Sequence, residues 1–504
     1  MNRAVKWVVW LGLSLVWGVA AAVADDAEVA RQIDRLLSTV KPGAMRYGVC
    51  VVDLQTIREV YAKNADEPFK PASNMKLLTV ATALDQLPPG FKYRTTLAKR
   101  GDDLVVLGRG DPSLGDPRLA RERREPITAM FHAWAAALQE KGITEVKGDL
   151  VIDDSAFEAE RYNPNWPADQ RDHWYSAPVG ALNFNDNCID VTVSPGGKPG
   201  EPAVIEVSPP NTYTVIRNEC RTGEQQRPTI ARRGDEPVYV VSGTCKSPGT
   251  LQSVCVPDPG LFFAGAMRTA LAAKGVRING SIRRERIRDD RGNLPPTCTV
   301  MAVYERPLTE LLDRINKNSQ NLFAECLFKT IGFELSAMEK GVGEGSYAAG
   351  RRYVERFIEK SLMSKPAGLV IDDGSGYSPR NRVSPRTLVG VLRHMARHPR
   401  GRDFRASLSR AGEDGTLEKR MKDLKGRVQA KTGYISGVYA LSGYASPGGG
   451  KTYCFSILLN DVANGTEARH LQDAICRILA TEGATAPSQP AQAAARPARA
   501  KAKK

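Results

Sequence analysis

The chain has 504 residues and a formal net charge of +15, from 71 Lys and Arg against 56 Asp and Glu. Seven of the positive charges lie near the two ends, at Arg3 and Lys6 and in the last nine residues, so the part between them is only mildly basic. This length excludes a single small module, and because no basic patch with interleaved aromatic residues occurs, we expect no binding to nucleic acid.

Residues 1–24 have the pattern of a secretory signal peptide. Arg3 and Lys6 precede an apolar run over 7–19, and Ala22-Val23-Ala24 supplies the small residues of a cleavage site. The apolar run is short for a membrane span. We therefore expect a periplasmic protein that is exported and soluble.

The nine cysteines predict disulfides, since paired cysteines are common in exported proteins. Cys220 and Cys245 flank a predicted strand-turn-strand and are the favoured pair, although the connectivity stays open. An odd number leaves at least one thiol unpaired in a monomer. No C-x-x-C occurs and the spacings match no zinc pattern, so we expect neither a metal nor another cofactor.

The first predicted elements are a buried strand over 47–54, a hairpin partner over 58–62 and an apolar helical run over 77–84. Ser73 and Lys76 stand three residues apart at the start of this helix, so both side chains lie on one face within reach for proton transfer. An ammonium cannot act as a base. Lys76 must therefore be neutral, and the helix N-terminus and a second nearby lysine would both lower its pKa.

A stretch of 242 residues separates Lys76 from Ser319. It contains strand-like runs at 104–107, 149–153 and 238–241 and one helical run at 127–141. We expect this stretch to form whole inserted domains rich in β-structure.

After the insertion, helical patterns dominate until residue 398, and strands follow. Helices are predicted over 308–315, 322–331 and 385–398, strands over 428–432, 438–445 and 452–459, and a last amphipathic helix over 467–479. Strands at both ends of a chain with helices between them favour an antiparallel sheet covered by helices, the α+β form of an α/β protein.

Three motifs occur in a fixed order: Ser73-x-x-Lys76, Ser319-x-Asn321 and Lys431-Thr432-Gly433. In this order they resemble the signature of penicillin-binding proteins and serine β-lactamases. Two further stretches, residues 108–114 and 373–378, resemble the D-alanyl-D-alanine carboxypeptidase/endopeptidase family, the class C low-molecular-mass penicillin-binding proteins. The resemblance runs from about residue 49 to residue 479.

The resemblance implies a penicillin-binding transpeptidase/β-lactamase-like catalytic domain that is interrupted by two nested inserted domains. We assign 25–92 and 291–480 to the catalytic domain, 93–118 and 190–290 to inserted domain II, and 119–189 to inserted domain III. Residues 481–504 are expected to be a disordered basic tail. Its five positive charges favour weak adsorption to an anionic wall or membrane surface.

The same resemblance implies that Ser73 attacks a peptidoglycan stem peptide and forms an acyl-enzyme, and that β-lactam antibiotics acylate it as covalent inhibitors. Lys76 is the expected base, Ser319 relays a proton to the leaving amine, Asn321 holds a substrate amide, and Lys431 supplies positive charge for the terminal carboxylate. The expected substrate-binding residues on and after the last motif are Thr432, Gly433, Tyr434 and Ser436.

Relatives that act on diaminopimelate peptides hold the side-chain ammonium with an aspartate and its carboxylate with an arginine. The aspartate position is Gln170 here, with Asp169 beside it, and the arginine position is Pro379, with Arg380 next. We expect Asp169 and Arg380 to take the two roles by a small loop shift. The alternative, that both are ordinary solvated charges, stays open.

Two other kinds of protein remain as alternatives. A secreted serine β-lactamase shares the three motifs, but it does not need a 242-residue insertion. A non-catalytic wall-binding protein would keep the insertion and lose the site, whereas all three motifs are intact here. The sequence therefore favours the peptidase.

Overall fold

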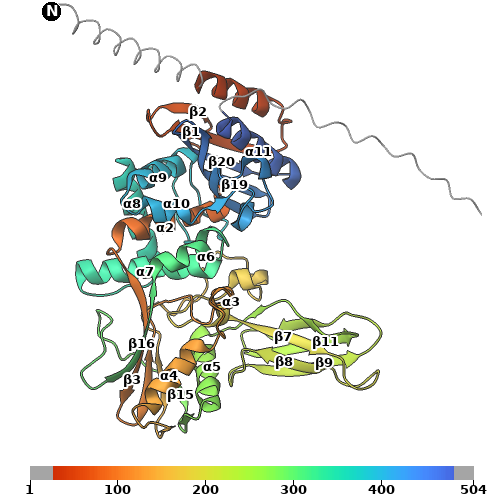
Figure 1. The fold of residues 1–504 in the computed structure, drawn as a ribbon, viewed down its shortest axis with the longest axis vertical. Coiled ribbons are helices and arrows are strands. Elements are labelled where there is room, and N and C mark those ends of the chain that lie inside the picture. Colours follow the sequence, from red (N-terminus) through yellow and green to blue (C-terminus); the bar gives the residue numbers. More distant parts are fainter. Residues whose placement is uncertain (1–25, 482–504) are drawn as a thin grey trace, which may run out of the picture.

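The computed structural model describes residues 26–481, so the predicted signal peptide 1–24 and all but the first residue of the predicted tail 481–504 lie outside the described residues. The described chain forms an upper body, a lower body and a side lobe (Figure 1). Within this range no helix combines the length and the apolar character needed to cross a membrane.

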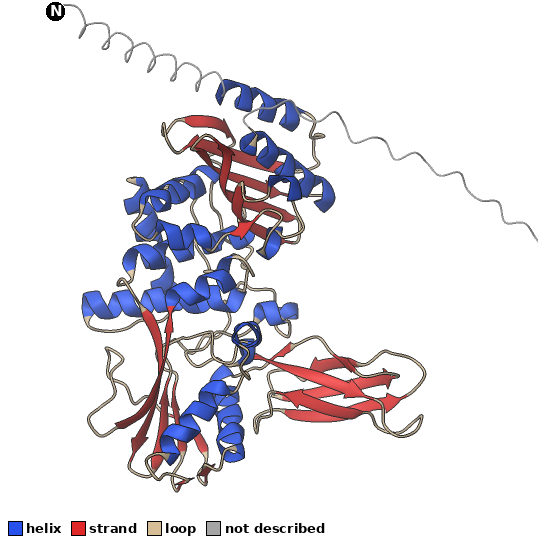
Figure 2. Ribbon diagram, in the orientation of Figure 1, coloured by secondary structure: helices blue, strands red, loops and turns tan. Residues whose placement is uncertain are grey.

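The upper body is built on a six-stranded sheet with the order β17-β18-β19-β20-β1-β2, in which all neighbours are antiparallel. Helices cover it on both faces (Figure 2). The predicted class, an antiparallel sheet flanked by helices, is confirmed. The strands are β1 Arg46–Asp53, β2 Glu59–Lys63, β17 Ser409–Arg410, β18 Val428–Ile435, β19 Val438–Gly448 and β20 Lys451–Asn460.

Alternation along β1 explains why this sheet has two hydrophobic faces. Val49 and Val51 join the core under α11 and residues 26–38, whereas Cys50 and Val52 join the core under the remaining helices. The helices of the upper body are α2 Met75–Gln86, α6 Leu312–Asn316, α7 Asn321–Lys340, α8 Tyr347–Leu362, α9 Pro385–Arg397, α10 Gly401–Ala406 and α11 Gly465–Ala480. Helix α7 lies where the upper body meets the lower body (Figure 1).

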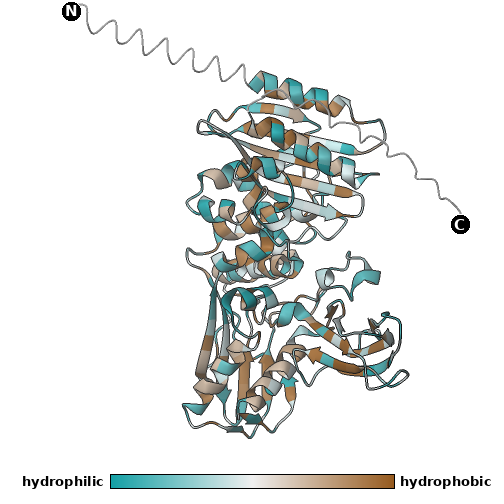
Figure 3. Cartoon of the chain, turned by 45° about the vertical axis from the view of Figure 1, so that its right-hand side comes forward, coloured by the Kyte–Doolittle hydropathy of each residue, from teal (hydrophilic) through white to brown (hydrophobic). Residues whose placement is uncertain are grey.

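The lower body contains a five-stranded sheet with the order β15-β6-β4-β3-β16, and α4 and α5 pack against it. Hydrophobic stretches run along its strands (Figure 3). Its strands are β3 Lys92–Arg100, β4 Asp103–Leu107, β6 Leu150–Asp153, β15 Ile282–Arg284 and β16 Thr299–Pro307, with the short pair β5 Glu145–Val146 and β14 Arg277–Ile278. Its helices are α3 Pro117–Arg123, α4 Ala129–Gln139 and α5 Pro259–Ala273.

Pairing in the lower body crosses the residue ranges that we assigned to separate domains. Strand β6, from the range 119–189, pairs in parallel with β4, from the range 93–118. Strand β16, from the range 291–480, pairs with β3 over its whole length. Hydrophobic patterns indicate where strands lie but not which partners they choose, so the domain boundaries stay a prediction.

The side lobe projects from the lower body and contains two small sheets (Figure 1). Cys220 on β9 and Cys245 on β11 were predicted to flank a strand-turn-strand, but β9 and β11 run parallel and β10 returns between them in the sequence. All nine cysteines are free thiols in the structure. The strands are β7 Cys188–Ser194, β8 Val204–Ser208, β9 Val215–Thr222, β10 Thr229–Arg232, β11 Val238–Cys245, β12 Gly249–Thr250 and β13 Val254–Cys255.

Candidate active site

Ser73 lies in a short 3-10 helix, Ala72–Asn74, that leads directly into α2. Ala72 has a positive φ of 44°, which is costly for a residue with a Cβ. The chain after Asp373 packs against this turn, because a Cβ on Gly376 would lie only 1.8 Å from the Ala72 carbonyl oxygen. The backbone that carries Ser73 is therefore packed directly against the chain at Gly376.

The Lys76 ammonium is fully buried and lies among three oxygen atoms. Its Nζ is 3.0 Å from Ser73 Oγ, 2.7 Å from Asn321 Oδ1 and 2.9 Å from the Ser375 carbonyl oxygen. Burial lowers the pKa of Lys76 to about 7, although the nearby carboxyl groups of Glu325 and Asp373 oppose this shift. A substantial neutral fraction therefore exists near neutral pH, at hydrogen-bond distance from the hydroxyl.

The cause of this low pKa differs from the one that the sequence suggested. We expected the helix N-terminus and a second lysine to disfavour the Lys76 cation, but the main cause is removal from water. The predicted second lysine is Lys431. Its own pKa is lowered well below the usual value, first by burial and then by the charge of Lys76. The motif spacing could not reveal how deeply either side chain is buried.

Ser319 and Lys431 form a second serine–lysine pair. Lys431 Nζ donates to Ser319 Oγ at 2.9 Å and to the Thr432 carbonyl oxygen at 2.8 Å. Ser319 has a left-handed φ of 58°, in the turn just before α7. Asn74 Nδ2 donates to the Lys431 carbonyl oxygen at 2.8 Å, which joins β18 to the segment that carries Ser73.

Strand β18 passes close to the Ser73 backbone because residue 433 is glycine. A Cβ at Gly433 would lie 3.1 Å from the Ser73 nitrogen and 2.9 Å from the Pro71 carbonyl oxygen. Thr432 Oγ1 donates to Thr416 Oγ1 at 2.7 Å. The Tyr434 side chain is 61% exposed, and the exposed Ser436 lies in the two-residue turn after β18. The strand edge beside Ser73 thus offers backbone and hydroxyl groups.

The inserted residues contact the Ser-x-Asn motif directly, which sequence reasoning missed. Asn321 Nδ2 donates to the Tyr175 carbonyl oxygen at 2.8 Å, and Gln320 Nε2 donates to Asp186 Oδ2 at 3.0 Å. Arg314 binds the same Asp186 oxygen at 3.0 Å and Asp116 Oδ2 at 2.6 Å. No local pattern marks these partners, because they lie 128 to 198 residues away along the chain.

Glu325, next to Lys76 and Ser375, is another residue of the site that the motifs did not reveal. It is fully buried, and its carboxyl group accepts from the backbone N–H of Gly374 at 3.0 Å and of Ser375 at 2.7 Å. Burial and the neighbouring Asp373 raise its pKa to about 8. These bonds aim the Ser375 carbonyl at Lys76. The signal was present, since Glu325 follows Asn321 by four residues on one helix face.

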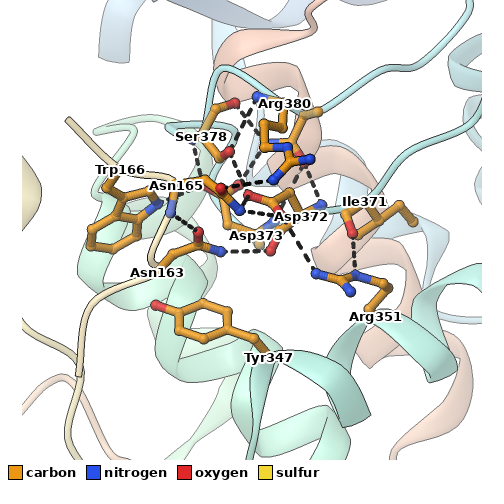
Figure 4. A network of polar contacts seen from close by, with 12 residues as sticks. Asn163, Asn165, Trp166, Tyr347, Arg351, Ile371, Asp372, Asp373, Ser378 and Arg380 are labelled. Atoms are coloured by element: carbon orange, nitrogen blue, oxygen red, sulfur yellow. Dashed lines mark hydrogen bonds and ion pairs between the residues drawn. The ribbon is translucent and has the colours of Figure 1, made fainter. Parts of the chain in front are cut away.

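Asp169 and Arg380, the residues predicted to hold a charged substrate side chain, are both exposed, and within residues 26–481 no ion pair joins them. Arg380 Nη1 donates to Asn165 Oδ1 at 3.0 Å, and Asn165 donates to Asp372 (Figure 4). Gln170 Oε1 accepts from the Tyr377 hydroxyl at 2.7 Å. The structure therefore places both charges on neighbouring loops but does not bring them together.

Two serine–lysine pairs beside a glycine strand edge define a serine acyl-transfer site of the penicillin-binding type. A model of the D-Ala-D-Ala carboxypeptidase 3 (S13) family matches residues 29–482, and the chain belongs to this family. The resemblance drawn from the motifs is confirmed.

Relatives of known name agree with this assignment. The chain is 33% identical over 505 residues to D-alanyl-D-alanine carboxypeptidase from Actinomadura sp. (strain R39), covering 92% of this chain and 87% of the relative. It is 25% identical to D-alanyl-D-alanine carboxypeptidase DacB from Haemophilus influenzae, covering 78% and 81%.

A solved structure supports the fold. The crystal structure of penicillin binding protein 4 (dacB) from Haemophilus influenzae superposes with a TM-score of 0.72 at 23% identity, covering 88% of this chain and 97% of that protein. The same protein has also been solved in complex with a β-lactam.

Proposed function

We propose that the protein is a serine D-alanyl-D-alanine carboxypeptidase and endopeptidase with Ser73 as its nucleophile. The observation that carries this proposal is the pairing of each motif serine with a buried lysine, at 3.0 Å for Ser73 and Lys76 and at 2.9 Å for Ser319 and Lys431. A hydroxyl becomes an effective nucleophile only when a base takes its proton, and a neutral lysine at this distance serves as that base.

In the proposed reaction, Ser73 Oγ attacks the carbonyl carbon of the penultimate D-alanine while Lys76 takes the hydroxyl proton. Fixed backbone N–H donors, those of Ser73 and Tyr434, hold the developing oxyanion, and each such donor is worth roughly 3 kcal/mol. Ser319 then passes a proton to the leaving amine. The peptide bond is replaced by an ester, and water later cleaves this ester to release the shortened stem peptide.

Substrate binding in this proposal follows from the groups along β18. Lys431 and Thr432 hold the terminal carboxylate of the stem peptide, and the peptide lies against the strand edge as an added strand beside Gly433. Asn321 uses one N–H of its amide for Tyr175 and has a second for a substrate carbonyl. A β-lactam presents a similar acyl group, so it forms an adduct on Ser73 that hydrolyses slowly.

Mass spectrometry of the purified protein incubated with penicillin tests the assignment. We expect one added mass of penicillin, on the peptide that contains Ser73, and none in Ser73→Ala. The exposed Ser364 provides a matched control, because Ser364→Ala should be labelled like the parent protein. An adduct that survives Ser73→Ala would disprove the role of this serine.

The same experiment separates the alternatives. A secreted β-lactamase would hydrolyse penicillin rapidly and accumulate little adduct, and a non-catalytic wall-binding protein would form none. Muropeptides then report the peptidase itself: loss of the terminal D-alanine measures the carboxypeptidase reaction, and conversion of cross-linked dimers to monomers measures the endopeptidase reaction.

The proposal also covers where the protein acts and which surfaces it binds. The leader pattern at 1–24 supports export to the periplasm, where peptidoglycan is the substrate. The five charges after residue 482 support weak adsorption to an anionic surface. A truncation at 482 should keep the turnover of soluble muropeptides and lose salt-sensitive binding to anionic vesicles.

A further inference from the structure

Two cysteines of the inserted residues face each other at close range. The Sγ atoms of Cys188 and Cys255 are 3.6 Å apart, and both side chains are buried, with 2% and 0% of their surface exposed. Cys188 begins β7 and Cys255 ends β13, and the two residues are direct partners in this antiparallel pair. Of the nine cysteines, these two are the pair whose sulfur atoms are in contact.

The register places this pair at a position that suits a disulfide. Val256 N donates to the Asn187 carbonyl oxygen at 2.9 Å, so the flanking residues make the ladder bond and Cys188 and Cys255 do not bond to each other through their backbones. At such positions the Cα atoms lie about 4.5 Å apart and the side chains are close. That separation falls within the range of roughly 4.4–6.8 Å found across disulfides.

We propose that Cys188 and Cys255 form an intrachain disulfide in the exported protein, and that this bond clamps the Ser-x-Asn motif. Each thiol loses one proton and the pair loses two electrons to a disulfide of a thiol oxidoreductase in the exported compartment, which is reduced to a dithiol. Since both sulfur atoms are buried in the folded protein, the exchange takes place while the chain folds. This step rests on the proposed export.

One side of the clamp reaches Asn321. The Cys255 N–H donates to the Asp172 carbonyl oxygen at 3.1 Å, and its thiol lies 3.0 Å from the His173 carbonyl oxygen. This segment continues into the turn Trp174–Ser176, whose Tyr175 carbonyl oxygen accepts from Asn321 at 2.8 Å. A fixed Cys255 therefore fixes the backbone that orients the asparagine of the motif.

The other side of the clamp reaches Gln320. Cys188 directly follows Asn185, Asp186 and Asn187, three residues with left-handed φ values of 51°, 54° and 55°. Such a turn is strained and persists only when its surroundings hold it. It presents Asp186 to Gln320, at 3.0 Å. A crosslink at Cys188 anchors the end of this turn, so one bond supports both contacts that the motif makes with the inserted residues, those to Tyr175 and to Asp186.

Peptide mapping without reductant tests the bond itself. The full chain is expressed with its leader in an exporting bacterial host, alkylated under denaturing conditions and digested. We expect a linked peptide pair containing Cys188 and Cys255. Free alkylated Cys188 and Cys255 in protein whose leader has been removed would overturn the proposal. An uncleaved leader would instead show that export failed, so the two failures are distinguishable.

Matched oxidised and reduced samples of one sequence test the clamp. Protein made without its leader in a reducing cytoplasm should acylate with penicillin about tenfold more slowly than the exported form, within the roughly 100-fold that a misplacement of about 1 Å can cost. Its Tm should be lower by roughly 3–5 °C. Refolding with oxidised glutathione should restore both values. Equal acylation rates in samples of verified redox state would remove the clamp.

Two double variants complete the test. Cys188→Ser with Cys255→Ser should keep the slow acylation rate of the reduced protein in every redox condition. Cys220→Ala with Cys245→Ala is the control, because these buried residues lie in the same lobe on β9 and β11, away from the motif contacts. This control should acylate at the rate of the oxidised parent. Slow acylation confined to the control would contradict the assignment.

Discussion

The reacting centre and the side-chain region of the site are held in opposite ways. Around Ser73 both lysines are fully buried and each contacts at least two oxygen atoms of the protein. Around Asp169 and Arg380 the charges are exposed, and the Arg380 guanidinium donates to the side chain of Asn165 rather than to a buried group. The difference shows that buried protein contacts fix the two lysines, whereas Asp169 and Arg380 stay accessible to solvent, as the proposed substrate-binding role requires.

The largest expected loss of acylation rate comes from replacing the buried lysines. Arginine keeps its proton at any pH that a protein survives, so Lys76→Arg cannot act as a base and should lower penicillin acylation by roughly 1,000-fold or more, as Lys76→Ala should. Lys431→Arg keeps a positive charge and should lose about tenfold. Stopped-flow acylation rates measure all three. Equal losses of rate in the two arginine variants would contradict the proposal that Lys76 acts as a base and Lys431 as a positive charge.

The next effect tests how closely β18 approaches the nucleophile. A Cβ at residue 433 would press on the Pro71 carbonyl at 2.9 Å, so Gly433→Ala must shift the strand away from Ser73. We expect acylation to fall by about 10- to 100-fold while Tm stays nearly constant, since misplaced oxyanion donors cost this much. Gly223→Ala is the control, because a Cβ there meets its nearest atom at 3.5 Å. Normal acylation in Gly433→Ala would leave the glycine without a role.

The motif residues were predictable because their spacing is local. Three residues on a helical turn bring Ser73 and Lys76 together, and the strands and helices around residues 385–480 follow from periodicity. The contacts of Glu325 and Asp186 were not found, since Glu325 binds backbone N–H groups about 50 residues away and Asp186 binds Gln320, 134 residues away along the chain. The parallel pairing of β9 with β11 was also missed, because alternation predicts strands and leaves their direction open.

The rate of penicillin acylation should fall at acid pH with a single apparent pKa. With a pKa of about 7, Lys76 is mostly protonated below that pH, and protonation removes the base. The second-order rate of penicillin acylation should therefore rise about tenfold per pH unit up to about pH 7 and then level off. A limb centred near pH 10 would indicate that the lysine is not desolvated in solution.

The smallest expected loss of activity comes from replacing the exposed charges Asp169 and Arg380. Asp169→Asn and Arg380→Ala should each lower kcat/KM by about 3- to 10-fold for stem peptides with free diaminopimelate and change it little for N-acylated or amidated peptides. Lys365→Ala, at an exposed position, is the control for general loss of surface charge. Equal kcat/KM values for free and N-acylated peptides in the parent protein would remove the proposed ammonium site.

Burial of Lys76 also makes the free energy of unfolding depend on pH. Because its pKa falls from 10.5 to about 7 on folding, the unfolded chain holds the proton more tightly between these values. The free energy of unfolding is therefore lowered by about 5 kcal/mol at pH 7 and below, and this loss shrinks to nothing as the pH approaches 10.5. Replacing Lys76 by methionine should give an inactive protein that melts at a higher temperature than the parent at pH 7, an advantage that fades toward pH 10. The residue that we propose as the base for Ser73 is thus one whose burial lowers the stability of the folded protein.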